Sequence, residues 1–96
     1  MSKGVDIICN DQAEGVAQLT ISGNLTLRNA TTVKQALIEA QDKYKHLSVL
    51  LSEVNSLDVS VIQIIMAAKS SNPAIQWNIT LSDDIQTLLV RAGLAL

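Results

Sequence analysis

The middle of the chain constrains the fold most, because a short apolar run is followed there by a helical pattern. Residues 48–51 read Ser-Val-Leu-Leu, and a run of this length and composition is typical of a buried strand. From residue 61 to about 70, apolar side chains share one face of a helix: Val61, Ile64, Ile65 and Ala68. A strand that leads into a helix predicts an α/β fold, in which helices pack on a sheet. We expect this strand to be buried on both faces.

The connection between this strand and this helix carries the candidate site. Residues 52–56 are polar except for Val54 and predict a turn. Asp58 stands where the helix begins, and Asp is a good N-cap because its side chain accepts from the free amides of the first turn. Ser60 is then the second helical residue, where the helix dipole stabilises a phosphate of about −1.5 to −2 charges. We therefore expect an exposed corner that presents Asp58 and Ser60.

The start of the chain predicts a β-hairpin. Residues 5–9 lean apolar, and residues 16–22 alternate between apolar and polar side chains, which is typical of a half-buried strand. Residues 10–12 and Gly15 predict the turn between them. Gly23 and Asn24 break the alternation, so we expect the second strand to end before them.

Two further helices and a fourth strand follow from periodicity. A helix that begins at Arg28 or Asn29 and runs to about Tyr44 has an apolar stripe of Ala30, Val33, Leu37, Ala40 and Tyr44. Pro73 ends the second helix, and residues 75–79 alternate as a strand does. For the last helix we expect Ser82 as N-cap and Gly93 as C-cap. Its predicted inward side chains are Ile85, Leu88, Leu89 and Ala92.

The predicted element order is therefore β-β-α-β-α-β-α within one domain that spans residues 1–96. Strands that alternate with helices imply crossover connections, and we expect a mixed four-stranded sheet with helices packed against it. In such folds, binding sites lie at the carboxyl ends of the strands. Asp58 and Ser60 follow the end of the third strand, which strengthens the interest of that corner.

Composition argues against several classes of function. The net charge is −2 and the aromatic residues are Trp77 and Tyr44, whereas nucleic-acid binding requires clustered cations and stacking rings. Cys9 and His46 are single residues of their kind, so we expect neither an internal disulfide nor a metal site. No apolar run reaches the about 18 residues of a membrane span, and residues 1–6 lack a signal peptide's apolar stretch. We expect a cytoplasmic protein without direct membrane insertion.

An enzyme or nucleotide binder is also disfavoured. The four glycines are scattered along the chain, so no Gly-rich loop can cradle phosphate. Ser60 beside Asp58 lacks a base that could activate it as a nucleophile, and the Asp83–Asp84 pair is explained by a helix N-terminus. We therefore expect no catalytic residue and no cofactor.

Three segments resemble the STAS domain, the module of bacterial anti-sigma factor antagonists. Residues 19–26 are similar to the family's strand followed by Gly-x-Leu-Asp or Gly-x-Leu-Thr. Residues 49–62 are similar to its apolar strand, Asp-Leu-Ser-x-Val, and then Asp-Ser-Ser-Gly-Leu, and residues 88–94 match its ending. The three segments span nearly the whole chain in the family's order.

The resemblance implies a non-enzymatic switch in which a partner kinase, often the anti-sigma factor itself, phosphorylates a residue at the start of the second helix. That residue aligns with Ser60, and Asp58 is its acidic neighbour. The unphosphorylated form binds the partner and phosphorylation weakens the complex. The surface around Ser60 is the predicted partner-binding site: Asn24, Thr26, Asp58, Val59, Val61, Ile62, Gln63 and Met66.

Three positions depart from the family pattern. Leu50 and Thr26 stand where the family has Asp, and Val61 stands where it has Gly. These losses favour an alternative that the resemblance also offers, a constitutive interaction subunit of a transporter ATPase or sensory assembly that needs no phosphorylation. An edge strand near the N-terminus also allows a dimer.

Overall fold

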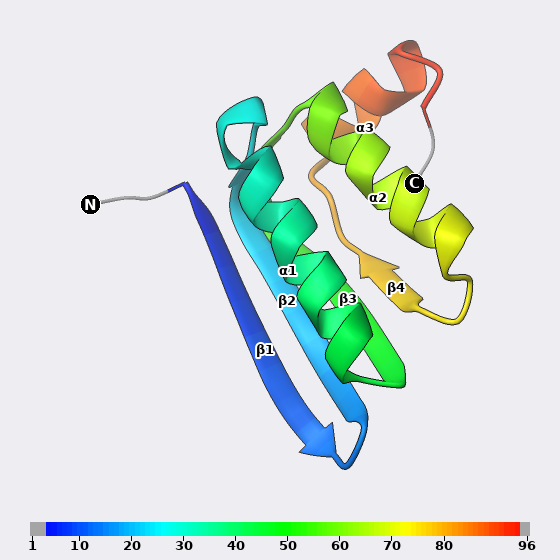
Figure 1. Cartoon of the computed structure of the whole chain (residues 1–96). Helices are drawn as coiled ribbons and strands as arrows, with labels where there is room; N and C mark the ends of the chain where they lie inside the picture. Colours follow the sequence, from blue (N-terminus) through cyan, green and yellow to red (C-terminus); the bar gives the residue numbers. More distant parts are fainter. Residues whose placement is uncertain (1–3, 95–96) are drawn as a thin grey trace.

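The fold of this protein is built on one mixed β-sheet. The computed structural model describes residues 4–94, and these form four strands, three α-helices and one 3-10 turn (Figure 1). Their bounds are β1 Val5–Ala13, β2 Val16–Leu25, η1 Leu27–Asn29, α1 Ala30–Lys43, β3 His46–Leu57, α2 Val59–Ser71, β4 Gln76–Ile79 and α3 Asp83–Arg91. The predicted α/β class, element order and mixed sheet are confirmed.

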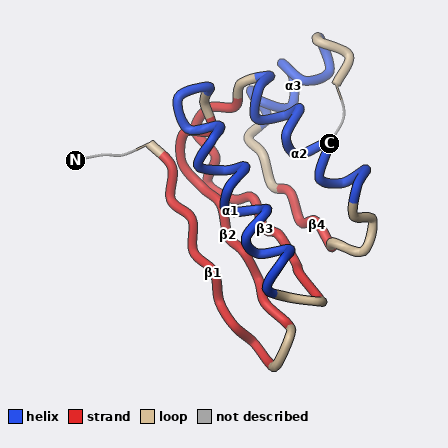
Figure 2. The backbone as a smooth tube through the Cα atoms, in the orientation of Figure 1, coloured by secondary structure: helices blue, strands red, loops and turns tan. Residues whose placement is uncertain are grey.

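The sheet order is β1-β2-β3-β4. β1 is antiparallel to β2, whereas β2, β3 and β4 run parallel to one another. Figures 1 and 2 show α1 and α2 side by side over one face of the sheet, with α3 beyond the amino end of α2. The carboxyl ends of β2 and β3, η1 and the start of α2 therefore meet at one end of the molecule.

The core lies between the sheet and the helices. Alternate residues of the two central strands point toward α1 and α2 and are buried, while α1 and α2 each contribute one apolar stripe. The largest fully buried side chains are Leu19, Ile21, Leu25, Val33, Leu37, Val49, Leu51, Val61 and Ile65. Burying one aliphatic side chain of this size contributes about 1.5–3 kcal/mol, so this single layer holds the elements in place.

The other face of the sheet is not covered by a helix. Its side chains on β2 and β3 are half-buried and mostly polar: Gln18, Thr20, Ser22, Ser48, Leu50 and Ser52. The prediction that the third strand is buried on both faces is therefore wrong. Because α1 and α2 pack on the same side, each central strand alternates between core and solvent in the manner of a half-buried sheet.

Both central strands run further than the sequence pattern predicts. β3 continues through the predicted polar turn to Leu57, with Glu53 at φ 51° and irregular register beside it. β2 passes through Gly23, whose φ is 97°, to Leu25. The Asn24 N–H donates to the Gly4 carbonyl, and a Cβ on Gly23 would overlap the Gly4 backbone. These extensions bring the ends of β2 and β3 to the start of α2.

Smaller boundary differences occur at the helices and the hairpin. β1 reaches Ala13 instead of ending near Cys9, and α2 begins at Val59, two residues before the predicted apolar pattern starts and directly after the predicted N-cap position. α1 begins at Ala30 after η1, and its predicted stripe is buried up to Ala40. These shifts lengthen elements without changing the topology.

The end of the chain confirms its predicted caps. The Ile85 N–H donates to Ser82 Oγ at 3.3 Å. After α3, the Leu94 N–H bonds to the Leu89 carbonyl and the Gly93 N–H to that of Val90, which is a Schellman motif. Ile85 and Leu89 are buried, but Leu88 and Ala92 are exposed. Their predicted inward orientation is wrong, because α3 touches the core along a narrow stripe.

Candidate functional site at the start of α2

Asp58 connects the start of α2 to the 3-10 turn. It occupies the predicted N-cap position, but its carboxylate does not accept from the amides of its own helix. Instead, Asp58 Oδ2 accepts from the Leu27 N–H at 2.8 Å, and the Asp58 N–H donates to the Leu25 carbonyl at 2.8 Å. The predicted local cap is therefore wrong. Asp58 holds η1 against α2 across 31 residues of chain.

Asn24 and Thr26 lie at the same corner and shape the turn. The Asn24 carbonyl accepts from Asn29 Nδ2 at 2.8 Å, and Asn24 Oδ1 accepts from Ser56 Oγ at 3.2 Å. Thr26 precedes η1 and its carbonyl accepts from the Asn29 N–H at 2.9 Å. The two residues join the ends of β2 and β3 to η1, so the structure brings these predicted site residues together with Asp58.

Ser60 is the second residue of α2, as predicted, but its hydroxyl is not presented at the surface. Ser60 Oγ is buried and has no hydrogen-bond partner among residues 4–94. An unsatisfied buried polar group destabilises a fold by about 1–3 kcal/mol. The predicted exposed corner is thus wrong for this hydroxyl, which must turn outward before any other molecule can reach it.

The remaining predicted partner residues divide between core and surface. Val61 and Ile62 are fully buried, which corrects their predicted exposure. Val59, Gln63 and Met66 are exposed. The division follows from the helical period, because Ile62 lies three residues before Ile65 and shares its buried face of α2.

Three exposed apolar side chains surround Asp58, and we call them the apolar corner: Leu27, Val59 and Leu88. They come from η1, α2 and α3 and are 69%, 54% and 64% exposed. Leu27 lies beside Asp58 through the bond to its amide, and Val59 follows Asp58 directly in the chain. The sequence pattern does not predict Leu27 and Leu88 as site residues, because η1 has no periodic pattern and the helical period predicts Leu88 in the core.

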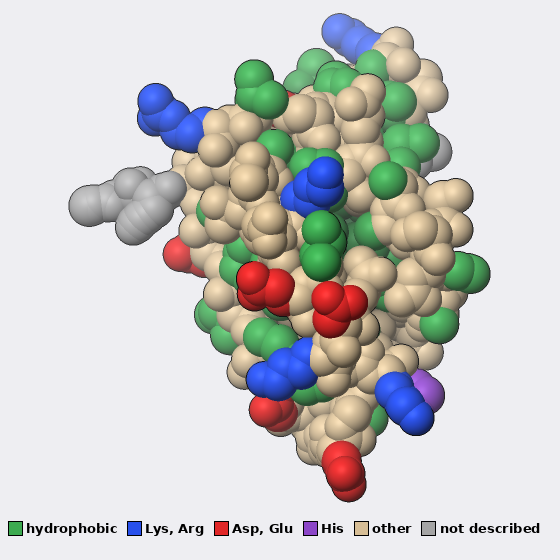
Figure 3. All heavy atoms as spheres, viewed as in Figure 1, with side chains coloured by type: hydrophobic (Ala, Val, Ile, Leu, Met, Phe, Trp, Pro, Cys, Tyr) green, Lys and Arg blue, Asp and Glu red, His purple; other side chains and the backbone are tan. Residues whose placement is uncertain are grey.

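A groove runs from the apolar corner along α3, and we call it the α2–α3 groove. It has a volume of about 550 Å³, and Val59 and Leu88 line it together with Leu57, Ile62 and Ile85. Asp58 and Asp84 are the charged side chains among its described lining residues. In Figure 3, Asp and Glu side chains gather over the lower half of the visible face, away from the end where α2 begins. The groove is therefore an apolar surface with little charge.

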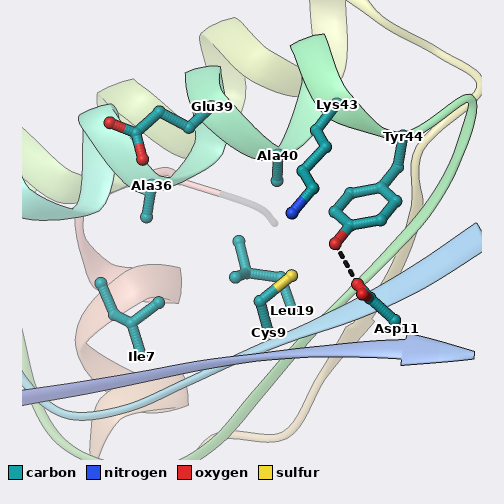
Figure 4. A pocket seen from close by; sticks show the side chains of 9 residues that line it. All are labelled: Ile7, Cys9, Asp11, Leu19, Ala36, Glu39, Ala40, Lys43 and Tyr44. Carbon is teal, nitrogen blue, oxygen red and sulfur yellow. Dashed lines mark hydrogen bonds between the residues drawn. The ribbon is translucent and has the colours of Figure 1, made fainter.

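A second cavity lies between β1 and α1, toward the opposite end of α1 (Figure 4). It has a volume of about 350 Å³ and an apolar floor that includes Ile7 and Leu19. At its rim the Tyr44 hydroxyl donates to Asp11 Oδ1 (Figure 4). This bond, together with desolvation and the nearby Cys9, raises the pKa of Tyr44. No sequence pattern indicates this pair, since its partners lie 33 residues apart.

Residues 4–94 contain neither of two other kinds of site. Within residues 4–94, His, Cys, Asp and Glu side chains form no group of three or more that could hold a metal ion. In the same part of the chain, no helix has the length and apolar character needed to cross a membrane. The apolar corner and the α2–α3 groove thus remain the strongest candidate site.

Comparison with known proteins agrees with this geometry. A crystal structure of an anti-sigma factor antagonist from Mycobacterium paratuberculosis matches with a TM-score of 0.72 at 18% identity, over 93% of this chain and 78% of that one. The Bacillus cell fate determinant SpoIIAA in the phosphorylated form matches with a TM-score of 0.59 at 10% identity, over 93% of this chain and 85% of that one. At such identities the likeness shows the fold.

Sequence comparison identifies the family. No curated protein matches the sequence. The family model described as "Mlab, STAS domain" matches residues 9–95. Since this match covers nearly the whole chain, the protein belongs to the STAS domain family, a family of non-enzymatic interaction modules.

Proposed function

We propose that this chain is a non-enzymatic, cytoplasmic interaction subunit that docks on a larger protein through the apolar corner and the α2–α3 groove. The observation that carries the proposal is the exposure of Val59 and Leu88 in one groove, with the exposed Leu27 bonded through its amide to Asp58 of the same groove. An apolar surface rimmed by polar residues is typical of a protein-binding site. Apolar side chains near the centre of an interface supply much of its affinity, because they lose water on binding.

The partner that fits best is a transporter ATPase subunit or another large assembly that the domain binds constitutively. Two features support constitutive binding over a switch. The Ser60 hydroxyl is buried, and Leu50 and Thr26 stand where the family pattern has Asp. A kinase needs an accessible hydroxyl and acidic groups that orient it. In the folded state the hydroxyl is buried, and of the acidic groups only Asp58 remains beside it.

A phosphorylation switch at Ser60 is the second candidate. One observation favours it: the hydrogen bonds of α2 begin with the Val61 and Ile62 amides, both of which donate to the Asp58 carbonyl at 3.1 Å. The amides of Val59 and Ser60 precede these bonds, and Asp58 Oδ2 is bonded to Leu27. A phosphate on an outward-turned Ser60 would therefore meet free amides at a helix N-terminus. In this version the partner is an anti-sigma factor or serine kinase.

Affinity capture from the native cell separates the two candidates. The baits are the parent, Ser60→Ala, Ser60→Asp, Leu88→Asp and Val90→Asp, each first checked for folding by circular dichroism. Leu88 and Val90 are both exposed on α3, at 64% and 77%, but Leu88 lines the α2–α3 groove and Val90 lies on another face. Val90→Asp is therefore a matched control for adding one charge to α3.

For constitutive docking, one large ATPase or sensory protein copurifies with the parent, both folded Ser60 variants and Val90→Asp, and Leu88→Asp loses it. A buried, unpaired interface charge of this kind weakens binding by about 2–5 kcal/mol. For the switch, only Ser60→Asp and Leu88→Asp lose a kinase-like partner, and mass spectrometry finds phosphate on Ser60. Equal capture by Leu88→Asp and the parent would remove the groove from the proposal.

A further inference from the structure

The outer edge of β1 is open within the part of the chain that the structure describes. β1 is nine residues long and pairs with β2 on one side, while its other side is the edge of the sheet. Most of its residues are exposed. The opposite edge strand, β4, has four residues. A long edge with free N–H and C=O groups is a template for pairing with another strand.

The hydrogen-bond phase of β1 identifies which residues can pair outward. The Asn24 N–H donates to the Gly4 carbonyl, and this pair continues the β1–β2 register of Val5 with Gly23. In an antiparallel ladder, every second residue exchanges hydrogen bonds with the same neighbour. The even-numbered residues of β1 therefore bond to β2, and the backbone groups of Val5, Ile7, Cys9 and Asp11 face the open edge.

We propose that a second copy of this chain pairs with the open edge, β1 against β1 and antiparallel, with Cys9 opposite Cys9 on the two-fold axis. Cys9 is the central residue of the nine in β1. Centring the pair there places Ile7 opposite Asp11, where outward-facing backbone groups meet each other, and Val5 opposite Ala13, which lies beyond the register shift of β1. A two-fold axis between two residues would pair outward-facing groups with groups that already bond to β2. An axis at Ile8 or Asn10 would bring outward-facing groups together but would leave one end of β1 unpaired.

The side chains of β1 fit this register. Asp6 lies opposite Gln12 and Asp11 opposite Ile7. The register therefore avoids placing like charges opposite each other, an arrangement that would destabilise the pair. A pair centred on Asp11 would oppose two carboxylates, and one centred on Ile7 would leave the end of β1 unpaired. The register centred on Cys9 uses the whole strand, and its central part avoids the irregularity between Asp11 and Ala13.

Ile8 gives an independent reason for a second copy. It is 56% exposed, and its even number in β1 places it on the sheet face that the helices leave open. In the proposed register, the two Ile8 side chains are diagonal neighbours across the axis, within reach of each other. The pairing thus covers an exposed large apolar side chain at the point where the two sheets join.

The inference is independent of the proposed function. β1 lies at one edge of the sheet (Figure 1), whereas residues from the end of β3, from α2 and from α3 line the α2–α3 groove. A β1 dimer would therefore leave both grooves open, and each copy could still dock on its partner.

Sedimentation of Cys9→Pro and Cys9→Ser tests the backbone pairing under reducing conditions. Proline is tolerated on an edge strand where the N–H faces solvent, so Cys9→Pro keeps the β2 ladder but loses the central bonds of the dimer. We expect the parent and Cys9→Ser to reach dimer mass with rising concentration. Cys9→Pro should require at least about tenfold more protein to dimerise to the same extent, which is equivalent to a loss of at least about 1.4 kcal/mol of dimerisation free energy. Identical curves for Ser and Pro, or a monomeric parent, would overturn the proposal.

Disulfide trapping tests the register. Cys9 is a free, exposed thiol, and in a hydrogen-bonded pair the two Cα atoms lie about 5.5 Å apart, within disulfide range. Diamide should take two electrons and two protons from the two thiols and link the parent as a dimer. The control Cys9→Ser/Gln12→Cys moves the thiol so that the two copies lie roughly 20 Å apart. Equal linking of both proteins would contradict the register.

Discussion

The N-cap side chains of α2 and α3 form hydrogen bonds with different kinds of partner. At α3, Ser82 caps its own helix, since its Oγ accepts from the Ile85 N–H three residues later. At α2, Asp58 occupies the same position, but its carboxylate accepts from the Leu27 N–H, 31 residues earlier. The first is a local bond that serves one helix. The second joins two elements and leaves the first amides of α2 without their capping side chain.

A capping residue in a sequence therefore predicts where a helix starts, but it does not predict which group its side chain will bond to. A local cap is satisfied wherever the helix forms. A long-range bond depends on the fold that brings the donor to it. Substitutions at the α2 start should therefore disturb several elements, whereas substitutions at the α3 start should disturb one.

The largest effect is expected from Gly23→Ala, which acts on the strand end beneath the α2 start. Gly23 has a φ of 97°, and an added Cβ would overlap the Gly4 backbone. Strain and overlap together should lower the free energy of unfolding by about 2–4 kcal/mol. Urea denaturation measures the loss. The control is Gly15→Ala, where φ is 74° but nothing lies within 4 Å of the added Cβ, and an equal loss there would assign the effect to φ alone.

Asp58→Ala should have the next largest effect. It removes the acceptor of the Leu27 N–H, and a bond to a charged group contributes about 1.5–3 kcal/mol. Because Asp58 is exposed, we expect the lower part of this range. Hydrogen exchange should accelerate in η1 as well as in the first turn of α2. Faster exchange in α2 alone would show that Asp58 acts as an ordinary cap.

Ser82→Ala is the local counterpart. Loss of an N-cap side chain costs about 1 kcal/mol, and the effect should remain within α3. Hydrogen exchange of the α3 amides measures it, with η1 and α2 as internal controls. Acceleration at η1 would mean that α3 and the α2 start are coupled more closely than their hydrogen bonds show.

Ser60→Ala should change stability little, or raise it by up to about 1 kcal/mol. The hydroxyl that it removes is buried without a partner in the described residues, and removing such a group relieves its desolvation penalty. Urea denaturation of parent and variant gives the sign. A loss above about 1 kcal/mol would indicate that the hydroxyl is bonded in solution, in which case the constitutive proposal would need revision.

The Tyr44–Asp11 bond extends the comparison to a second long-range contact and gives the smallest effect. The raised pKa of Tyr44 means that the folded state favours the neutral phenol. Stability from this bond is full below the ordinary tyrosine pKa of about 10 and is lost as pH rises above it. Between roughly pH 9 and 11, rising pH should lower the free energy of unfolding more for the parent than for Tyr44→Phe. Parallel curves would exclude a contribution from this bond.

The sequence predicted the parts of the fold that depend on local rules. Alternation identified β2 and β4, and turn and cap residues placed Ser82 and Gly93 at the ends of α3. The end of β3 could not be predicted in this way. Residues 52–56 are polar except for the buried Val54, because one sheet face is open. Glu53 adopts a positive φ within the strand, so the pattern resembles a turn.

The candidate site was predicted in position but not in chemistry. Asp58 and Ser60 do lie at the start of α2 beside Asn24 and Thr26. The partner of Asp58 and the inward hydroxyl of Ser60 follow from how η1 packs, and η1 has no periodic signature. The period of α2 already places Ile62 in the core, because it lies three residues before the buried Ile65 and each residue turns a helix by about 100°.

The bond between Leu27 and Asp58 has a consequence for binding thermodynamics. Leu27 presents the most exposed apolar side chain of the apolar corner from a backbone whose N–H is already held at 2.8 Å. A partner that covers this side chain does not have to order the turn that carries it. Ordering flexible loops and side chains is a main entropic cost of association, so a preorganised turn allows a small surface to bind more tightly than its area alone would indicate.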